Sequence, residues 1–177
     1  KKVGLAGTNQ SPKLVKKIPR LGSFLSWGSV ILLAFSIATG LLGIRNAYFN
    51  FNMTFFWIIC FLGLFYLSAL FGNFFKLINP WDNLIRIIQA RIPGSFNGRR
   101  AYPQSWGIYP ALVLYVVLIW IELFAATTPW SLSWILLAYT AINIVAAWWW
   151  GRAAWFDHGE VFNVLFGFAA RMSAWSF

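Results

Sequence analysis

The order of apolar and polar positions divides the chain into long apolar stretches separated by shorter polar segments. Four of the stretches approach the roughly 20 apolar residues that a helix needs to cross a bilayer. They are Phe24–Ile44, Thr54–Phe75, Ile108–Ala126 and Ser131–Trp150. Apolar runs of this length indicate transmembrane helices rather than core helices of a soluble domain. The pattern therefore predicts an all-α membrane protein with four transmembrane helices.

The connection between the second and third stretches contains the pattern of an amphipathic helix. Asn79 is a favoured N-cap residue, Pro80 suits the first helical turn, and Asp82 places a negative charge at the positive end of the helix dipole. Apolar side chains recur at helical spacing from there: Trp81, Leu84, Ile85, Ile88 and Ile92. We expect a helix over residues 80–92 that forms an elbow along the cytoplasmic membrane surface. The alternatives are a docking surface for another subunit and a lid over a site.

The last apolar stretch, Val161–Trp175, is shorter than a span and carries Arg171. It predicts a terminal apolar helix over residues 160–175, as a half-membrane helix, an interfacial helix or the start of a fifth span. Arg171 would pair with an acid or mark the water interface. We expect one helical membrane domain over residues 24–177, after a basic cytoplasmic segment over residues 1–23.

Small residues lie roughly along one side of the first predicted span: Ser29, Ser36, Gly40 and Gly43. Small side chains let the backbones of two helices approach closely within a membrane. We therefore interpret this stripe as a helix-packing face and not as a cofactor groove.

The composition supports a membrane location, and the distribution of charge predicts an orientation. The chain is 60% hydrophobic and only 10% charged, whereas soluble domains carry about 25% charged residues. Thirteen of the 14 Lys and Arg residues fall in residues 1–23, 76–107 and 151–177. Basic residues collect on the cytoplasmic side of membrane proteins, so we predict both ends and the long connection on the cytoplasmic side of the inner membrane. Topology and anionic lipids then explain the net charge of +10, and no nucleic-acid motif is present.

Glu122 is the acidic residue that lies inside a predicted span, about four residues from its outer end. A carboxylate in hydrocarbon is costly, so we expect Glu122 to face protein, with Thr39 and Trp134 as hydrogen-bond donors at similar depth. The functional interpretations are a proton relay, a general base, a metal ligand or an ion site. The structural interpretation is a carboxyl group that joins two helices through hydrogen bonds.

The segment WFDHGE holds the single histidine of the chain, His158, between Asp157 and Glu160. Zinc and copper sites usually need three or four ligands, and no other His or Cys lies close in sequence. One histidine also excludes a haem held by two histidines of this chain. We predict no metal or cofactor in this chain, apart from bound lipid. The structural interpretation is that Asp157 and Glu160 cap the following helix, with Gly159 as the turn.

Three blocks of the sequence resemble bacterial and archaeal integral membrane proteins known as fenitrothion hydrolases. The blocks are GLFYLSALFGNFFKLINPWDNL, YPQSWGIYPALVLYVVLIWIELF and GRAAWFDHGEVFNVLFGFAARMS. They cover most of the chain from Phe61 to Ser173, and the shared elements include Asn79-Pro80-Trp81. Many members carry an acid where this chain has Asn73. Members are also usually longer, which agrees with the expectation that a sequence beginning at Lys1 is part of a longer protein. The resemblance implies a multi-pass membrane protein that cleaves organophosphate esters.

Few catalytic groups are present, and the apolar surface is rich in aromatic residues. We therefore expect a non-catalytic integral membrane subunit or scaffold of a larger complex, with other membrane subunits and anionic lipids as partners. The alternative implied by the resemblance is a membrane-bound organophosphate or ester hydrolase, with these candidate residues: Glu122, Asp157, His158 and Glu160. A second alternative is a proton-coupled transporter that uses Glu122. The expected structural or interface residues are Asn79, Pro80, Trp81, Asp82 and Arg171.

Overall fold

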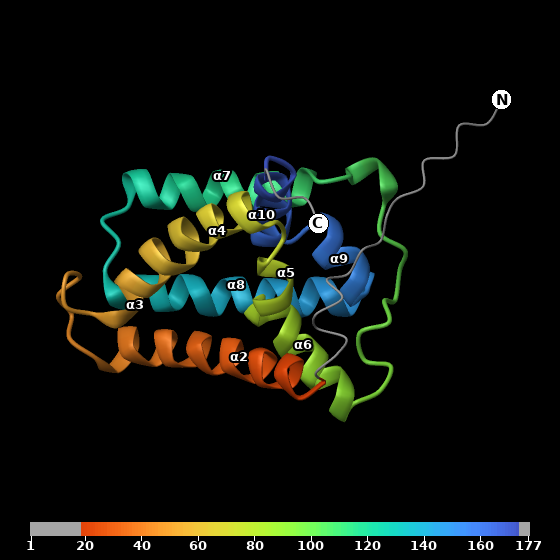
Figure 1. The fold of residues 1–177 in the computed structure, drawn as a ribbon, viewed down its shortest axis with the longest axis horizontal. Helices are drawn as coiled ribbons and strands as arrows, with labels where there is room; N and C mark the ends of the chain where they lie inside the picture. Colours follow the sequence, from red (N-terminus) through yellow and green to blue (C-terminus); the bar gives the residue numbers. More distant parts are fainter. Residues whose placement is uncertain (1–18, 174–177) are drawn as a thin grey trace.

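The computed structural model describes residues 19–173, and every regular element among them is a helix (Figure 1). Most of the basic segment 1–23 and the last two residues of the predicted terminal helix lie outside this range. The elements in chain order are α2 (Pro19–Leu42), α3 (Phe51–Met53), the π-helical η1 (Thr54–Gly63), α4 (Leu64–Phe71), α5 (Phe75–Ile78), α6 (Pro80–Arg91), the 3₁₀ turn η2 (Gln104–Trp106), α7 (Tyr109–Phe124), α8 (Pro129–Trp150), α9 (Arg152–His158) and α10 (Val161–Arg171).

Three helical segments of the described residues are long and apolar enough to cross a membrane: Gly22–Leu42, Phe51–Phe71 and Pro129–Trp150. They correspond to the first, second and fourth predicted spans. The third predicted span is the helix α7, which has 16 residues and therefore measures about 24 Å, less than the roughly 30 Å of a hydrocarbon core. It ends at Phe124 because Ala125 is extended and Thr128 already caps α8.

The second spanning segment, which runs through α3, η1 and α4, differs from the prediction at both ends. It starts at Phe51 rather than Thr54 because the Asn50 side chain caps it, accepting a hydrogen bond from the Asn52 amide. It stops at Phe71 rather than Phe75 because Gly72 adopts φ 85°, a conformation that breaks a helix. The chain then turns into the separate short helix α5.

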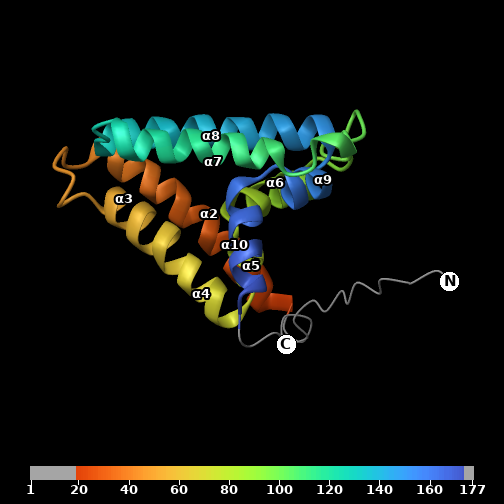
Figure 2. The ribbon, with the colours of Figure 1, turned by 90° about the horizontal axis from the view of Figure 1, so that it is seen from above.

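The long helices form a wedge, which Figure 2 shows from above. Helices α7 and α8 run along one side, and α2 and the α3–α4 segment diverge from them. Loops 43–50 and 125–128 lie at the closed end of the wedge, and the connection 92–108 lies at the other end (Figure 1). The short helices α5, α6, α9 and α10 fill the open end, so most polar segments of the chain gather there.

Helix α2 packs closely on α8 through its small residues. Ser36 is 1% exposed, and a Cβ atom at Gly40 would overlap the side chains of Asn52 and Ser133. The Ser133 hydroxyl donates a hydrogen bond of 3.0 Å to the carbonyl oxygen of Ile37. The predicted stripe is thus buried at Ser36 and Gly40, whereas Ser29 accepts a hydrogen bond from Asn83 of α6 and Gly43 is exposed.

Phe162, in the first turn of α10, is the centre of the aromatic core. Its ring contacts those of Phe56, Phe75, Trp81 and Tyr139, from four different elements, with centroid distances of 5.4 to 6.2 Å. The predicted terminal helix is α10, whose 11 residues are too few for a fifth span and whose N-terminal half is buried in the core. A pattern of apolar positions does not distinguish a membrane surface from a protein core, and here the core takes that face.

The predicted elbow helix exists as α6, and Asn79 caps it as expected. Much of its apolar face is buried within the chain, while Ile92 at its end is 60% exposed. Trp81 is 4% exposed and Ile85 is fully buried, because α6 packs against α2, α8 and α9. The chain's own helices therefore cover the start of the face that the sequence assigned to the membrane surface, and its placement on the membrane stays a prediction.

Candidate functional site: a polar junction and an apolar groove

The two polar motifs of the sequence meet in space. The amide nitrogen of the Asn79 side chain donates a hydrogen bond of 3.0 Å to Glu160 Oε2. Each residue also caps a helix. Asn79 Oδ1 accepts from the amides of Trp81 and Asp82, and Glu160 accepts from those of Phe162 and Asn163. The N-termini of α6 and α10 are thus joined through their caps, and we call this contact the polar junction.

Glu160 is fully buried at the polar junction. Besides Asn79 and two backbone amides, the Tyr139 hydroxyl donates to Glu160 Oε1 at 2.5 Å. Burial raises the pKa of the Glu160 carboxyl, and these hydrogen bonds oppose the rise. The carboxyl group also lies at the positive end of the α10 dipole. Every one of these interactions is structural, and they use the acceptor capacity of both oxygens.

Ion pairs surround a polar cavity of about 190 Å³ beside the polar junction. Arg152 Nη1 lies 2.7 Å from Asp82 Oδ1, and Lys76 Nζ lies 3.2 Å from Asp157 Oδ1. The second carboxylate oxygen of Asp82 pairs with Arg86 at 3.2 Å. Asp157 does not cap α10, contrary to the structural interpretation of the sequence, because it lies within α9 and Glu160 alone takes the N-cap position.

His158 ends α9 on an exposed surface, apart from the other candidate residues. Its ring stacks on Tyr102 with a centroid distance of 5.5 Å, and Nδ1 lies 3.1 Å from the carbonyl oxygen of Ala154. Neither His158 nor Glu160 lines the polar cavity. Within residues 19–173, no three His, Cys, Asp or Glu side chains lie close enough together to hold a metal ion. The candidate catalytic residues do not converge on one site.

Glu122 lies in the last turn of α7 and is exposed. No hydrogen bond or ion pair joins it to any described residue. The expected donors are engaged elsewhere, since the Thr39 hydroxyl binds the carbonyl oxygen of Ser36 and the Trp134 ring packs on Trp130. The prediction that Glu122 faces this chain's own helices is therefore wrong.

Arg171 does not pair with an acid of the described residues. Its guanidinium carbon lies 5.2 Å from the centroid of the Phe168 ring, three positions earlier in α10. At the last turn of the helix a positive charge also meets the negative end of the dipole.

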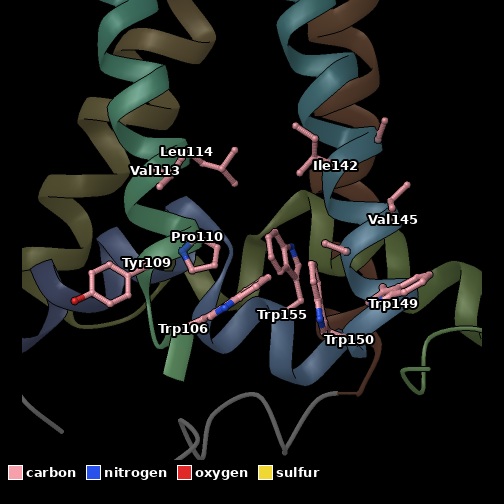
Figure 3. A pocket seen from close by; sticks show the side chains of 12 residues that line it. Trp106, Tyr109, Pro110, Val113, Leu114, Ile142, Val145, Trp149, Trp150 and Trp155 are labelled. Atoms are coloured by element: carbon pink, nitrogen blue, oxygen red, sulfur yellow. The ribbon is translucent and has the colours of Figure 1, made fainter. Parts of the chain in front are cut away.

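A large apolar groove separates α7 from α8 (Figure 3). Its volume is about 860 Å³, which is within the range of roughly 300–1,000 Å³ common for ligand sites. Val113 of α7 and Ile142 and Val145 of α8 line its length, and Trp rings close one end (Figure 3). The rings of Trp150 and Trp155 stack there with centroids 5.6 Å apart.

The connection 92–108 wraps around the end of α8 next to this groove. The amides of Arg99 and Arg100 both donate to the carbonyl oxygen of Trp149, at 2.8 and 3.0 Å. The guanidinium of Arg99 lies 3.6 Å from the Trp148 ring centroid, and that of Arg100 lies 5.5 Å from that of Trp149. Sequence reasoning missed this cap, although a helix ending in three Trp residues offers ring faces to nearby cations.

Comparison with family models, with curated proteins and with solved structures gave no significant match. The resemblance to fenitrothion hydrolases therefore stays a prediction. The candidate site thus consists of a polar junction with saturated hydrogen bonds, an open apolar groove and a carboxylate that the described residues leave uncovered.

Proposed function

We propose that this chain is a non-catalytic subunit of a larger complex in the cytoplasmic membrane, and that a partner helix covers the outer end of α7. The observation that carries the proposal is the exposed carboxyl group of Glu122 at the end of an otherwise apolar helix. In this arrangement α7 serves as the fourth crossing, the basic connection 92–108 lies in the cytoplasm, and loop 125–128 lies on the opposite side.

The roles of the other acidic residues support a structural function. Asp82 is held by two arginines, Asp157 pairs with Lys76, and Glu160 joins two helix caps. A general base or nucleophile needs an open position toward a substrate, and these carboxylates are committed to partners within the chain. Their interactions hold the open end of the wedge together.

The pattern of burial along α7 indicates where a partner would bind. Ala111 is 2% exposed, and Tyr115 and Leu118 are half-buried against the core. Glu122 follows Leu118 at i+4 and so lies on the same side of the helix, yet it is exposed. The described chain therefore stops covering this inner stripe one turn before Glu122, and a helix of another subunit can complete it.

The chemistry of Glu122 narrows the partner to a membrane helix with a hydrogen-bond donor or a basic side chain. Ionisable residues at membrane depth face protein or water and find partners there, because the exposed charge is expensive in hydrocarbon. Polar contacts and close packing, rather than apolar attraction, drive helix association in lipid. A donor placed opposite Glu122 would stabilise the contact between α7 and the partner helix, and it would fix how far the two helices are shifted along each other.

A photo-crosslinking amino acid at Leu123 tests the proposal in native membranes. Leu123 is 69% exposed beside Glu122, and Ile31 of α2, which is 61% exposed, is the matched control position. We expect a discrete protein adduct at Leu123 and only lipid adducts at Ile31. The adduct should disappear with Glu122→Leu and persist with Glu122→Gln, which keeps an acceptor oxygen. Lipid adducts alone at both positions would contradict the proposal.

A further inference from the structure

The groove between α7 and α8 has the shape and chemistry of a site for one hydrocarbon chain. It is open along its length and lined almost wholly by apolar side chains, among them Val113 of α7 and Ile142 of α8 (Figure 3). Its closed end is made of Trp rings, including Trp150 and Trp155. Trp rings prefer the depth at which lipid headgroups meet the acyl chains, so the closed end fits the headgroup end of a lipid.

Unpaired positive charge lies at this same end. Lys76, Arg86 and Arg152 are neutralised by carboxylates. By contrast, Arg99 and Arg100 are exposed and have no carboxylate partner among residues 19–173. Both are fixed by their backbone amides to Trp149, a residue that lines the groove. The guanidinium of Arg100 therefore lies near the ring of Trp149, a lining residue, and that of Arg99 packs on the adjacent Trp148, which does not line the groove.

We propose that this groove binds an anionic phospholipid, with one acyl chain between α7 and α8 and the phosphate at Arg99 and Arg100. The guanidinium group is well suited to phosphate because it presents paired N–H donors in one plane. One face of each guanidinium group lies over a Trp ring. The N–H groups along its edge therefore stay available to the phosphate. This site is independent of the proposed subunit contact, which lies at the opposite end of α7.

A lipid fits this groove better than a partner helix. A helix with its side chains is about 10–12 Å in diameter, and it would have to displace α7, whose Ala111 is anchored in the core. An acyl chain is narrower and follows the existing space. The arginine pair also favours a headgroup that carries negative charge over a zwitterionic one.

The experiment uses the purified chain in detergent and compares retention of phosphatidylglycerol and phosphatidylcholine of the same acyl composition by native mass spectrometry. Arg99→Gln/Arg100→Gln removes the charge, and Val113→Trp fills the groove from an exposed position. The matched controls are Arg45→Gln, which removes a charge at the other end of the helices, and Ile31→Trp, which adds a ring outside the groove. Thermal unfolding of each variant establishes that it is folded.

We expect wild-type protein to retain the anionic lipid roughly thirtyfold better than the zwitterionic one, as two arginines near a lipid surface imply. The double Gln variant should bind both lipids equally, and Val113→Trp should lose both, while the two control variants behave as wild type. Equal retention of the two lipids by wild type would overturn the proposal. So would a preference that survives in both test variants, or displacement of the lipid by inorganic phosphate alone.

Discussion

The carboxyl groups at the polar junction and at the outer end of α7 lie in opposite environments. At the junction, Glu160 is fully buried and accepts hydrogen bonds from two side chains and two backbone amides. At the end of α7, Glu122 is exposed and has no partner among the described residues. One carboxyl group is therefore satisfied within the described residues, whereas the other is not.

Replacing Glu160 with Ala should have the largest effect on stability. The change leaves the donors of Asn79 and Tyr139 buried without an acceptor and removes the cap of α10. Each buried donor left without an acceptor costs about 1–3 kcal/mol, so the loss should be several kcal/mol. Denaturant unfolding of the detergent-solubilised chain measures it. Glu122→Ala is the matched control, and we expect it to change stability by less than about 0.5 kcal/mol. Equal losses for the two variants would erase the contrast between the two regions.

Helix α8 has a tightly packed neighbour, α2, and a loosely packed one, α7, and Gly40 tests the tight contact. A Cβ atom at Gly40 would overlap Asn52 and Ser133, so Gly40→Ala should destabilise the chain by about 1–3 kcal/mol. Gly28 is the control in the same helix, because nothing lies within 4 Å of a Cβ atom there. Gly28→Ala should be neutral or stabilising by up to about 1 kcal/mol. Thermal unfolding compares the pair, and similar losses would argue against a close α2–α8 contact.

The ion pairs of the open end should contribute to the free energy of unfolding in the order of their burial. Arg152 and Asp82 are 32% and 14% exposed and lie 2.7 Å apart, whereas Lys76 and Asp157 are 62% and 50% exposed. Arg152→Ala should therefore cost about 1 kcal/mol, while Lys76→Ala should cost less than about 0.5 kcal/mol. Unfolding at low and high salt checks both values. A larger loss for Lys76→Ala would mean that the exposed pair, rather than the half-buried one, holds the junction.

Local signals in the sequence were sufficient for much of the fold. Long apolar runs gave the three helices of spanning length, and the Asn-Pro-Trp-Asp motif gave the start of α6 because caps act on the next few amides. The small residues of α2 gave its packing face. The length of α7 was overestimated, since the extended residues before the Thr128 cap are as apolar as the helix itself.

Contacts between distant segments could not be predicted in the same way. Asn79 and Glu160 each carry a cap signal, but nothing in either motif says that the two caps touch. The apolar face of α6 and the ring of Phe162 were equally compatible with a membrane surface and with a core. Only the packing of the surrounding helices shows that Trp81, Ile85 and the Phe162 ring lie in the core. The sequence identified Glu122 as a candidate. That no described residue pairs with it follows from the packing of α7, whose side chains packed against the core end at Leu118, one turn earlier.

The mass of the native complex tests the central claim most directly. The chain would be solubilised from its own membranes with wild-type Glu122, with Glu122→Gln and with Glu122→Leu, and each preparation would be weighed by native mass spectrometry. We predict that the wild-type and Gln forms have a mass well above that of one chain with bound lipid, and that the Leu form has the mass of a single folded chain. A single-chain mass for the wild type, or an undiminished complex with Glu122→Leu, would contradict the account.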